Sequence, residues 1–203
     1  MGNFDLVVIG ACHGFWLEND VKKCSNKILL IEPVDYNFNQ LKNRFKNYKN
    51  VIFENIAIGE KNELIDFYYV SENSLVRLGK HWASGIGSFS KKHILKCKTK
   101  RFPITEEDIK CVNIKTITFD KLVEKYKIKF ITKLVIDAEG FDDEIIKSIN
   151  FKKIFIKEII FEKKHLNVTQ KIGNRLDEIK DFLLKENYKL FDIDTENILA
   201  RKT

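Results

Sequence analysis

The sequence has few prolines and glycines, and it has no long apolar run. Its 203 residues include two prolines and nine glycines, so a Pro- or Gly-rich linker between separate domains is not indicated. No segment approaches the roughly 20 uninterrupted apolar residues that a membrane-spanning helix needs. The first residues also lack the charged and apolar regions of a signal peptide. These absences predict a single domain over residues 1–203 with no membrane span.

Cysteine is sparse, and histidine shows no metal-ligand spacing. The four cysteines, Cys12, Cys24, Cys97 and Cys111, are scattered and form no Cys-x-x-Cys pair. This pattern is typical neither of a zinc site nor of a disulfide framework. We therefore expect a reducing compartment, the cytoplasm, and we predict no metal site.

The charge is basic, with a net value of +7 and a pI near 9.1. A basic surface favours anionic partners, but it is informative mainly where the charges cluster. One such cluster consists of Lys91, Lys92, Lys96, Lys98, Lys100 and Arg101. Runs of this kind are more often a solvated face than a binding site. A nucleic-acid partner is therefore kept as a less favoured alternative.

Apolar runs suited to buried strands alternate with helical patterns along the chain. The strands are expected at 6–9, 27–32, 51–58, 133–137 and 156–161, with an extra strand at 64–70 paired beside the third. The helices are expected at 15–24, 35–48, 142–148 and 168–186, with a short one just before the fourth strand. Segments 188–193 and 198–201 read as a terminal hairpin. The pattern predicts a doubly wound α/β fold with a mostly parallel sheet and an antiparallel C-terminal hairpin.

The alternating pattern fails between residues 71 and 101. A loop of this length is uncommon inside a compact domain unless it is functional or disordered. We therefore interpret 71–101 as a lid or insert beside the site.

Two strand ends carry residues suited to a ribose-bearing ligand. Gly10 and Gly14 follow the first strand, where they allow a sharp turn and a close approach to a ligand at a helix start. Glu32 ends the second strand, where a carboxylate can accept hydrogen bonds from both hydroxyls of a ribose. An ordinary tight turn would also explain the glycines. Because their spacing lacks the Gly-x-Gly-x-x-Gly pyrophosphate fingerprint, S-adenosylmethionine (SAM) is favoured over NAD.

In order and at compatible spacing, these segments resemble the FkbM family of SAM-dependent methyltransferases over most of the chain. Residues 134–140, Leu-Val-Ile-Asp-Ala-Glu-Gly, are similar to the family's Lys-Ile-Asp-Val-Glu-Gly signature. The other resembling segments are 8–14, Glu32-Pro33, 55–59, 85–90, 116–120, 159–162 and 196–200. Two departures are Val8, where the family has an acid, and Cys12, where it has Asn. They leave open a catalytically inactive methyltransferase-like binding protein.

The resemblance implies a class I methyltransferase domain that uses SAM and acts on a small-molecule or carbohydrate acceptor. The expected cofactor-binding residues are Gly10, Ala11, Cys12, His13, Gly14, Glu32, Pro33, Ile56, Ala57 and Asp137. The resemblance also predicts no N-terminal helical cap of the kind seen in longer relatives. Either a more open acceptor site or one completed by a second subunit of a homo-oligomer is then expected.

Four residues near the ends of the fourth and fifth strands are candidates for catalysis. If the acceptor is a hydroxyl, a base should remove its proton as the new bond forms. We predict that Asp137 is the carboxylate nearest the methyl group, that Glu139 orients the loop or pairs with a cation, and that Glu162 contacts the acceptor. His165 is a candidate base, although a surface histidine is the commoner outcome. Asp137 has a second interpretation, as the cap of the following helix.

Overall fold

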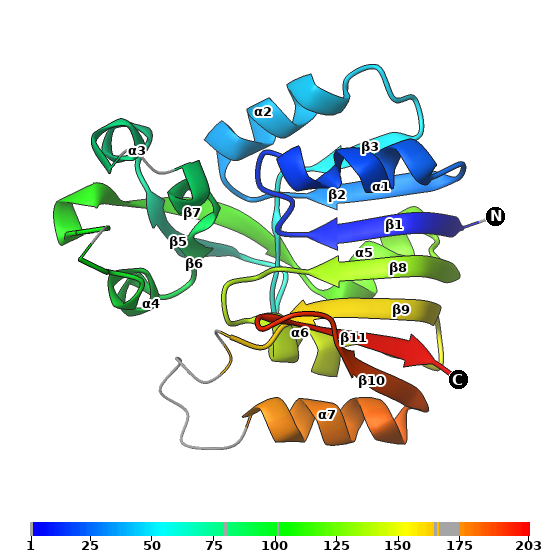
Figure 1. Ribbon diagram of the computed structural model, residues 1–203. Coiled ribbons are helices and arrows are strands. Elements are labelled where there is room, and N and C mark those ends of the chain that lie inside the picture. The colour runs from blue at the N-terminus through cyan, green and yellow to red at the C-terminus, as the bar shows by residue number, and fades with distance from the viewer. Residues whose placement is uncertain (1, 79–80, 101, 165, 167–174) are drawn as a thin grey trace.

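The computed structural model describes residues 2–78, 81–100, 102–164, 166 and 175–203. Its larger sheet has the strand order β10-β11-β9-β8-β1-β2-β3 (Figure 1). The strands are β1 (Asn3–Ile9), β2 (Lys27–Ile31), β3 (Val51–Glu54), β8 (Phe130–Ile136), β9 (Phe155–Glu162), β10 (Tyr188–Asp192) and β11 (Asn197–Lys202). Strands β3, β2, β1, β8 and β9 are parallel, whereas β11 runs antiparallel to both β9 and β10. The predicted doubly wound fold and terminal hairpin are confirmed.

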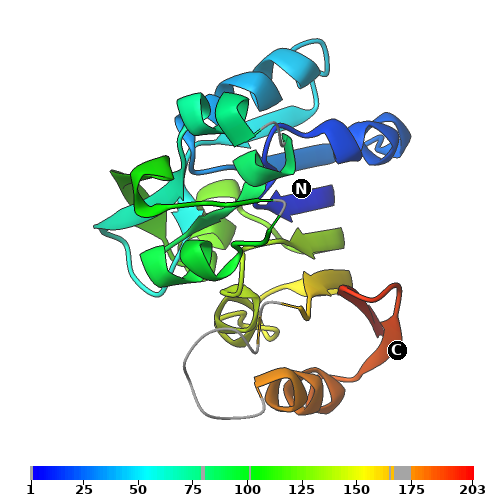
Figure 2. The ribbon, with the colours of Figure 1, turned by 60° about the vertical axis from the view of Figure 1, so that its left-hand side comes forward.

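Helices cover both faces of this sheet, which explains why its strands are almost continuously apolar. In β1, Val7 and Ile9 pack into one core and Leu6 and Val8 into the other. The first core is covered by α5 (Phe119–Tyr126), α6 (Asp142–Lys147) and α7 (Arg175–Lys185). The second is covered by η1 (Phe15–Leu17), α1 (Glu18–Lys23) and α2 (Asp35–Phe45). Figure 2 shows these elements in a view turned by 60° about the vertical axis.

The helices lie close to their expected positions. Helix α2 buries Leu41 and Phe45, two members of its apolar stripe. Helix α7 begins at Arg175, and the expected earlier part, residues 168–174, lies outside the described residues. Within the described part of the chain, no helix combines the length and apolarity that crossing a membrane requires.

A smaller sheet corrects two expectations about the third strand. It contains β4 (Ala57–Ile58), β5 (Leu64–Val70), β6 (Gly87–Ser88) and β7 (Ile109–Ile117), in the order β4-β7-β5-β6. Segment 51–58 is therefore not one strand, because β3 ends at Glu54 and β4 pairs with β7. Segment 64–70 is a strand, but it pairs antiparallel with β7 along its whole length instead of beside the third strand. Period-2 alternation shows that a strand has one buried face, but it does not identify the pairing partner.

The stretch that lacked a sequence pattern contains short helices. These are α3 (Glu72–Leu78), η2 (His81–Gly85) and α4 (Lys91–Lys96), followed by η3 (Glu106–Asp108). They share a small core made by Val70, Leu78, Ala83, Ile86, Ile94, Phe102 and Ile104. Together with the smaller sheet they form an insert that lies beyond the carboxyl ends of the parallel strands (Figures 1 and 2). Ligands of open α/β sheets bind at this edge.

Candidate functional site

A cavity of about 420 Å³ lies at the carboxyl ends of β1, β2 and β8, beneath the insert. Most of its lining is apolar, and the polar side chains include the carboxylates of Glu32, Asp137 and Glu139. The volume is within the range of roughly 300–1,000 Å³ usual for small-molecule sites. The insert contributes Phe67, Gly85, Gly87 and Phe89. The cavity is therefore enclosed by segments that are far apart in the sequence.

Gly10 brings the ends of three strands together. Its φ is 82°, and the N–H groups of Gly10 and Ala11 both donate to the carbonyl oxygen of Ile31, at 3.0 and 2.9 Å. A Cβ at Gly10 would meet the carbonyl oxygen of Asp137 at 1.9 Å. Glycine is required here because only a residue without a side chain allows this turn and this approach.

Glu32 is buried at the end of β2, with 4% of its surface exposed. Its Oε2 accepts a 2.9 Å hydrogen bond from the Cys12 N–H, and its Oε1 accepts one of 2.9 Å from the Val34 N–H. Burial raises the pKa of Glu32 to about 7, although these two hydrogen bonds oppose the rise. A side-chain hydrogen bond from Asn37 also opposes the rise. Each carboxylate oxygen has two lone pairs, so Glu32 keeps capacity to accept a further bond from a ligand hydroxyl.

Cys12 connects the loop after β1 to the insert. Its φ is 49°, in the left-handed region. Its Sγ lies 3.8 Å from the hydroxyl of Ser84, while the Ser84 carbonyl accepts a 2.7 Å hydrogen bond from Asn37. Burial and the neighbouring Glu32 raise the pKa of the Cys12 thiol to about 12. The thiol is therefore neutral, so its role here is in packing and not as a nucleophile.

Asp142 ties the turn after β8 to the end of β9. Its two carboxylate oxygens accept hydrogen bonds from the N–H groups of Ala138, at 3.3 Å, and Glu162, at 3.1 Å. Burial raises the pKa of Asp142 well above its usual range, and Asp137 adds to this. Helix α6 has Phe141 at its N-cap and no side-chain cap hydrogen bond. The interpretation of Asp137 as the helix cap is therefore wrong.

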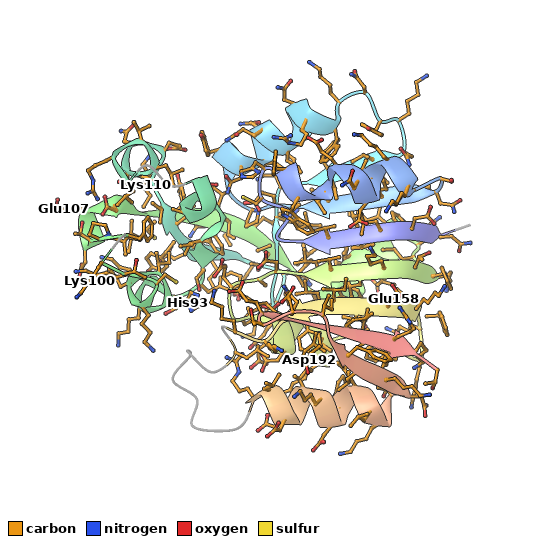
Figure 3. All side chains as sticks on the ribbon, viewed as in Figure 1. His93, Lys100, Glu107, Lys110, Glu158 and Asp192 are labelled. Atoms are coloured by element: carbon orange, nitrogen blue, oxygen red, sulfur yellow. The ribbon has the colours of Figure 1, made fainter. Side chains whose placement is uncertain are left out.

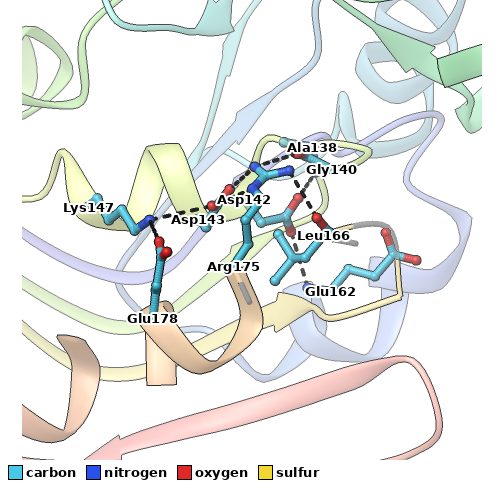
Figure 4. A network of polar contacts seen from close by, with 9 residues as sticks. All are labelled: Ala138, Gly140, Asp142, Asp143, Lys147, Glu162, Leu166, Arg175 and Glu178. Carbon is cyan, nitrogen blue, oxygen red and sulfur yellow. Dashed lines mark hydrogen bonds and ion pairs between the residues drawn. The ribbon is translucent and has the colours of Figure 1, made fainter. Parts of the chain in front are cut away.

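A buried ion pair between Arg175 and Asp143 stabilises the turn after β8 (Figure 4). Arg175 contacts both oxygens of Asp143, with Nε at 2.8 Å from Oδ2. The guanidinium also donates to the carbonyl oxygens of Gly140, at 3.1 Å, and Leu166, at 3.0 Å. The first residue of α7 thus fixes the backbone beside Glu139.

Glu139 lines the cavity and contacts the insert. Its φ is 49°, an uncommon conformation for a residue with a side chain. Its Oε2 lies 3.4 Å from Nε2 of His93, a buried residue of α4. Figure 3 shows His93 on the side of α4 that faces the main sheet. Phe89 stacks edge-on against Phe141, with ring centroids 5.2 Å apart. These contacts join the insert to the turn after β8.

The structure brings together most of the predicted site residues. Those that line the cavity are Gly10, Cys12, His13, Glu32, Pro33, Ile56, Ala57, Asp137 and Glu139. Three others do not: Ala11 is buried in the core, Gly14 packs against α2, and Glu162 is buried at the end of β9. His165 lies outside the described residues.

The sequence reasoning missed several residues that line the cavity, notably Trp16, Val34 and Phe67. Phe67 could have been identified from the sequence, because the segment that forms β5 alternates and Phe67 is one of its buried residues. Trp16 comes directly after the first glycine loop. This position was the only indication in the sequence that Trp16 lies at the site.

The lining fits the SAM that the family resemblance implies. A carboxylate at the end of β2 suits a ribose, and apolar walls including Ile56, Ala57 and Val34 suit an adenine ring. Asp137 and Glu139 supply negative charge for a sulfonium. Among the described residues, no group of three or more His, Cys, Asp or Glu side chains is arranged to hold a metal ion.

Comparison with known proteins gave one family match by sequence. The family model described as "Methyltransferase FkbM domain" matches residues 9–190. No curated protein sequence matches the chain.

Solved structures gave several similarities. Fibrillarin from Aeropyrum pernix, crystallised with natively bound S-adenosyl-L-methionine, is 10% identical with a TM-score of 0.47, over 97% of this chain and 66% of that one. The chain thus spans slightly less than two thirds of that fibrillarin. The N-methyltransferase NodS from Bradyrhizobium japonicum is 10% identical with a TM-score of 0.47, over 98% and 84% of the two chains. Precorrin-6y C5,15-methyltransferase from Geobacter metallireducens is 11% identical with a TM-score of 0.46, over 100% and 82%.

Proposed function

Because the chain belongs to the FkbM methyltransferase family, we propose that it transfers a methyl group from SAM to a hydroxyl of a carbohydrate or other small molecule. SAM, the cofactor predicted from the sequence, is the methyl donor. The observation that carries the proposal is the placement of Glu32, a buried carboxylate that lines a mostly apolar cavity at the end of a strand.

The residues around the cavity divide it into two ends. Glu32 would accept hydrogen bonds from the ribose hydroxyls, while Ile56 and Ala57 would contact the adenine. Asp137 and Glu139 form the other end, where a sulfonium is stabilised by nearby negative charge. The methyl group is therefore expected beside Asp137.

SAM supplies an activated methyl group, so the protein's main task is to position the acceptor oxygen behind it. We assign to Asp137 the role of accepting the hydroxyl proton as the carbon–oxygen bond forms. Glu139 lines the same end, and its contact with His93 holds its carboxylate in place. Glu162 lines neither end of this cavity, and its N–H supports Asp142.

We propose further that residues 1–203 act as one methyltransferase domain in which 71–101 form a lid. Gly85, Gly87 and Phe89 lie over the cavity, and Ser84 contacts both Cys12 and Asn37. The lid would exclude water from the transfer step. A cytoplasmic location remains part of this proposal.

The alternatives receive less support. Lys91, in the basic cluster, forms a 2.8 Å ion pair with Glu106, which lowers the charge offered to nucleic acid. Val8 is fully buried in a hydrophobic core and does not line the cavity, so its substitution for an acid leaves the cavity intact. Cys12 still donates its N–H to Glu32.

Transfer of radiolabelled methyl from SAM tests the proposal. The acceptors are a panel of neutral glycosides, small alcohols, nucleosides and RNA. We expect label on a hydroxyl of a neutral acceptor, at least a hundredfold less with Asp137→Asn, and unchanged transfer with the exposed control Asp66→Asn. Transfer only to RNA would favour the nucleic-acid alternative. Binding of SAM without transfer to any acceptor would favour the inactive relative.

A further inference from the structure

A second hollow of about 330 Å³ adjoins the cofactor cavity. Its floor is formed by Val135, Ile136 and Ile160 of the adjacent strands β8 and β9. Its sides are formed by Trp16 and Asp20 near α1, and by Ile193, Asp194 and Asn197 at the turn between β10 and β11. No described residue of the insert lines this hollow, and Asp137 is the one residue in its lining that was expected to bind the cofactor.

The hollow and the cofactor cavity share two lining residues. Trp16 and Asp137 line both spaces. Asp137 is the residue placed beside the methyl group in the proposed function. A molecule seated in the hollow would therefore lie next to Asp137, on a side of that residue to which the described part of the insert contributes no lining residue.

The walls combine an exposed aromatic ring with short polar side chains. Trp16 keeps 44% of its surface exposed, which is high for a tryptophan beside a cavity. A flat aromatic face can cover the apolar face of a sugar ring, while carboxylate and amide groups receive its hydroxyls. Ile193, half exposed on the opposite wall, adds a second apolar surface.

The charge of the hollow excludes anionic ligands. Three carboxylates line it, from Asp20, Asp137 and Asp194. Hydrogen bonds from the N–H of Glu196 and from Asn197 lower the pKa of Asp194, so it is ionised at neutral pH. Two lysines near this wall are paired with carboxylates: Lys133 with Asp20, at 3.1 Å, and Lys163 with Asp192. Phosphate groups would be repelled here, although the chain as a whole is basic.

We infer that this hollow is the acceptor subsite and that it takes a neutral sugar ring, stacked on Trp16 with one hydroxyl directed at Asp137. The inference rests on the proposed function for the identity of the adjoining cavity. The net charge of +7 leaves open whether the acceptor is neutral or anionic. The surface beside the reacting end of the cavity is acidic, which favours a neutral acceptor.

Ligand-observed NMR on the full chain, with and without S-adenosylhomocysteine, tests the subsite. The probes are methyl β-D-glucopyranoside and its galacto and manno isomers, glucose 6-phosphate, and a short oligouridine. Two variants block the hollow: Trp16→Ala removes the platform, and Ile193→Trp fills the space. Val76→Trp is the matched control, because Val76 is also an exposed aliphatic residue but lies on α3 in the insert.

We expect at least one neutral glycoside to bind wild type and Val76→Trp equally, and to bind both blocking variants at least tenfold more weakly. Glucose 6-phosphate should bind more weakly than the neutral sugar. Ile193→Trp should keep the wild-type affinity for S-adenosylhomocysteine, measured by calorimetry. Failure of every neutral glycoside to bind wild type, unchanged binding in Ile193→Trp, or tighter binding of the phosphate or oligouridine would overturn the subsite. Failure of wild type to bind S-adenosylhomocysteine would instead overturn the proposed function.

Discussion

The main-chain N–H of Cys12 donates a 2.9 Å hydrogen bond to Oε2 of Glu32, so the loop after β1 is fastened to the carboxylate that ends β2. This bond gives Glu32 two roles. It holds the first glycine loop in place, and it presents buried negative charge to the cavity. The two roles have opposite effects on stability, because burial of a carboxylate costs free energy that its hydrogen bonds only partly offset.

The stability of the ligand-free protein should depend on pH through Glu32. The pKa of this carboxyl rises from its ordinary 4.5 to about 7 on folding, so its contribution to stability is present below pH 4.5 and is lost as the pH rises through 7. The rise corresponds to about 3 kcal/mol. Urea unfolding at several pH values should show wild type losing about this much relative to Glu32→Gln between pH 4.5 and 8. A constant difference between the two proteins would contradict the assigned pKa.

Gly10→Ala should be strongly destabilising. The new Cβ would meet the Asp137 carbonyl oxygen at 1.9 Å, and φ is 82°, so we expect a loss of at least 2 kcal/mol. Gly85→Ala is the control within the same cavity, because its Cβ would meet only the Cys12 Sγ at an ordinary 3.8 Å. Thermal unfolding of the two variants checks this. Equal midpoints would mean that β1 and β8 do not approach so closely.

Arg175→Met should destabilise the protein by about 3–5 kcal/mol, because the buried Asp143 would keep only its longer contact with Lys147, at 3.7 Å. Arg175→Lys should not restore stability, since an ammonium cannot also reach the carbonyls of Gly140 and Leu166. Lys147→Met removes a partly exposed ion pair with Glu178 and a longer contact with Asp143, at 3.7 Å. It should cost less than Arg175→Met, because Arg175 would still contact both oxygens of Asp143. Denaturant unfolding of all three variants tests this order, and a similar cost for Arg175→Met and Lys147→Met would refute it.

Glu139→Gly should separate stability from function. The left-handed φ of 49° is less strained in glycine, so stability should be kept or rise by up to about 1 kcal/mol. Methyl transfer should fall, because the carboxylate in the cavity is gone. Lys127→Gly is the control: its φ is 51° at the end of α5, so stability should rise without any change in transfer. A stable Glu139→Gly variant with full activity would remove Glu139 from the site.

The main sheet and the cofactor end could be predicted from local signals. Apolar runs bounded by turns fixed the parallel strands, and the glycines and Glu32 were recognisable because they follow strand ends directly. Pairing between strands that are far apart in the sequence could not be predicted from such local patterns. Strand β5 was identified by its alternation, yet its partner β7 lies some 40 residues further along the chain and carries a weaker pattern.

The residues that support the site through buried contacts could also not be predicted from local sequence patterns. Asp143 and Arg175 read as ordinary surface charges in their own helices, and only the packing of α6 against α7 buries them together. Glu162 shows the converse. It ends a strand at the correct edge, but its side chain lies outside the cavity that the other strand ends form.

Calorimetric titration of S-adenosylhomocysteine at pH 8 tests the central claim most directly. The test variant is Glu32→Gln, which places an amide NH₂ where a carboxylate oxygen accepts a hydrogen bond from an N–H group. The control is Glu54→Gln, a matched change at the end of β3 outside the cavity. We expect wild type and Glu54→Gln to bind with the same affinity, and Glu32→Gln to bind at least tenfold more weakly. No binding by a folded wild-type protein, or equal binding by all three, would contradict it.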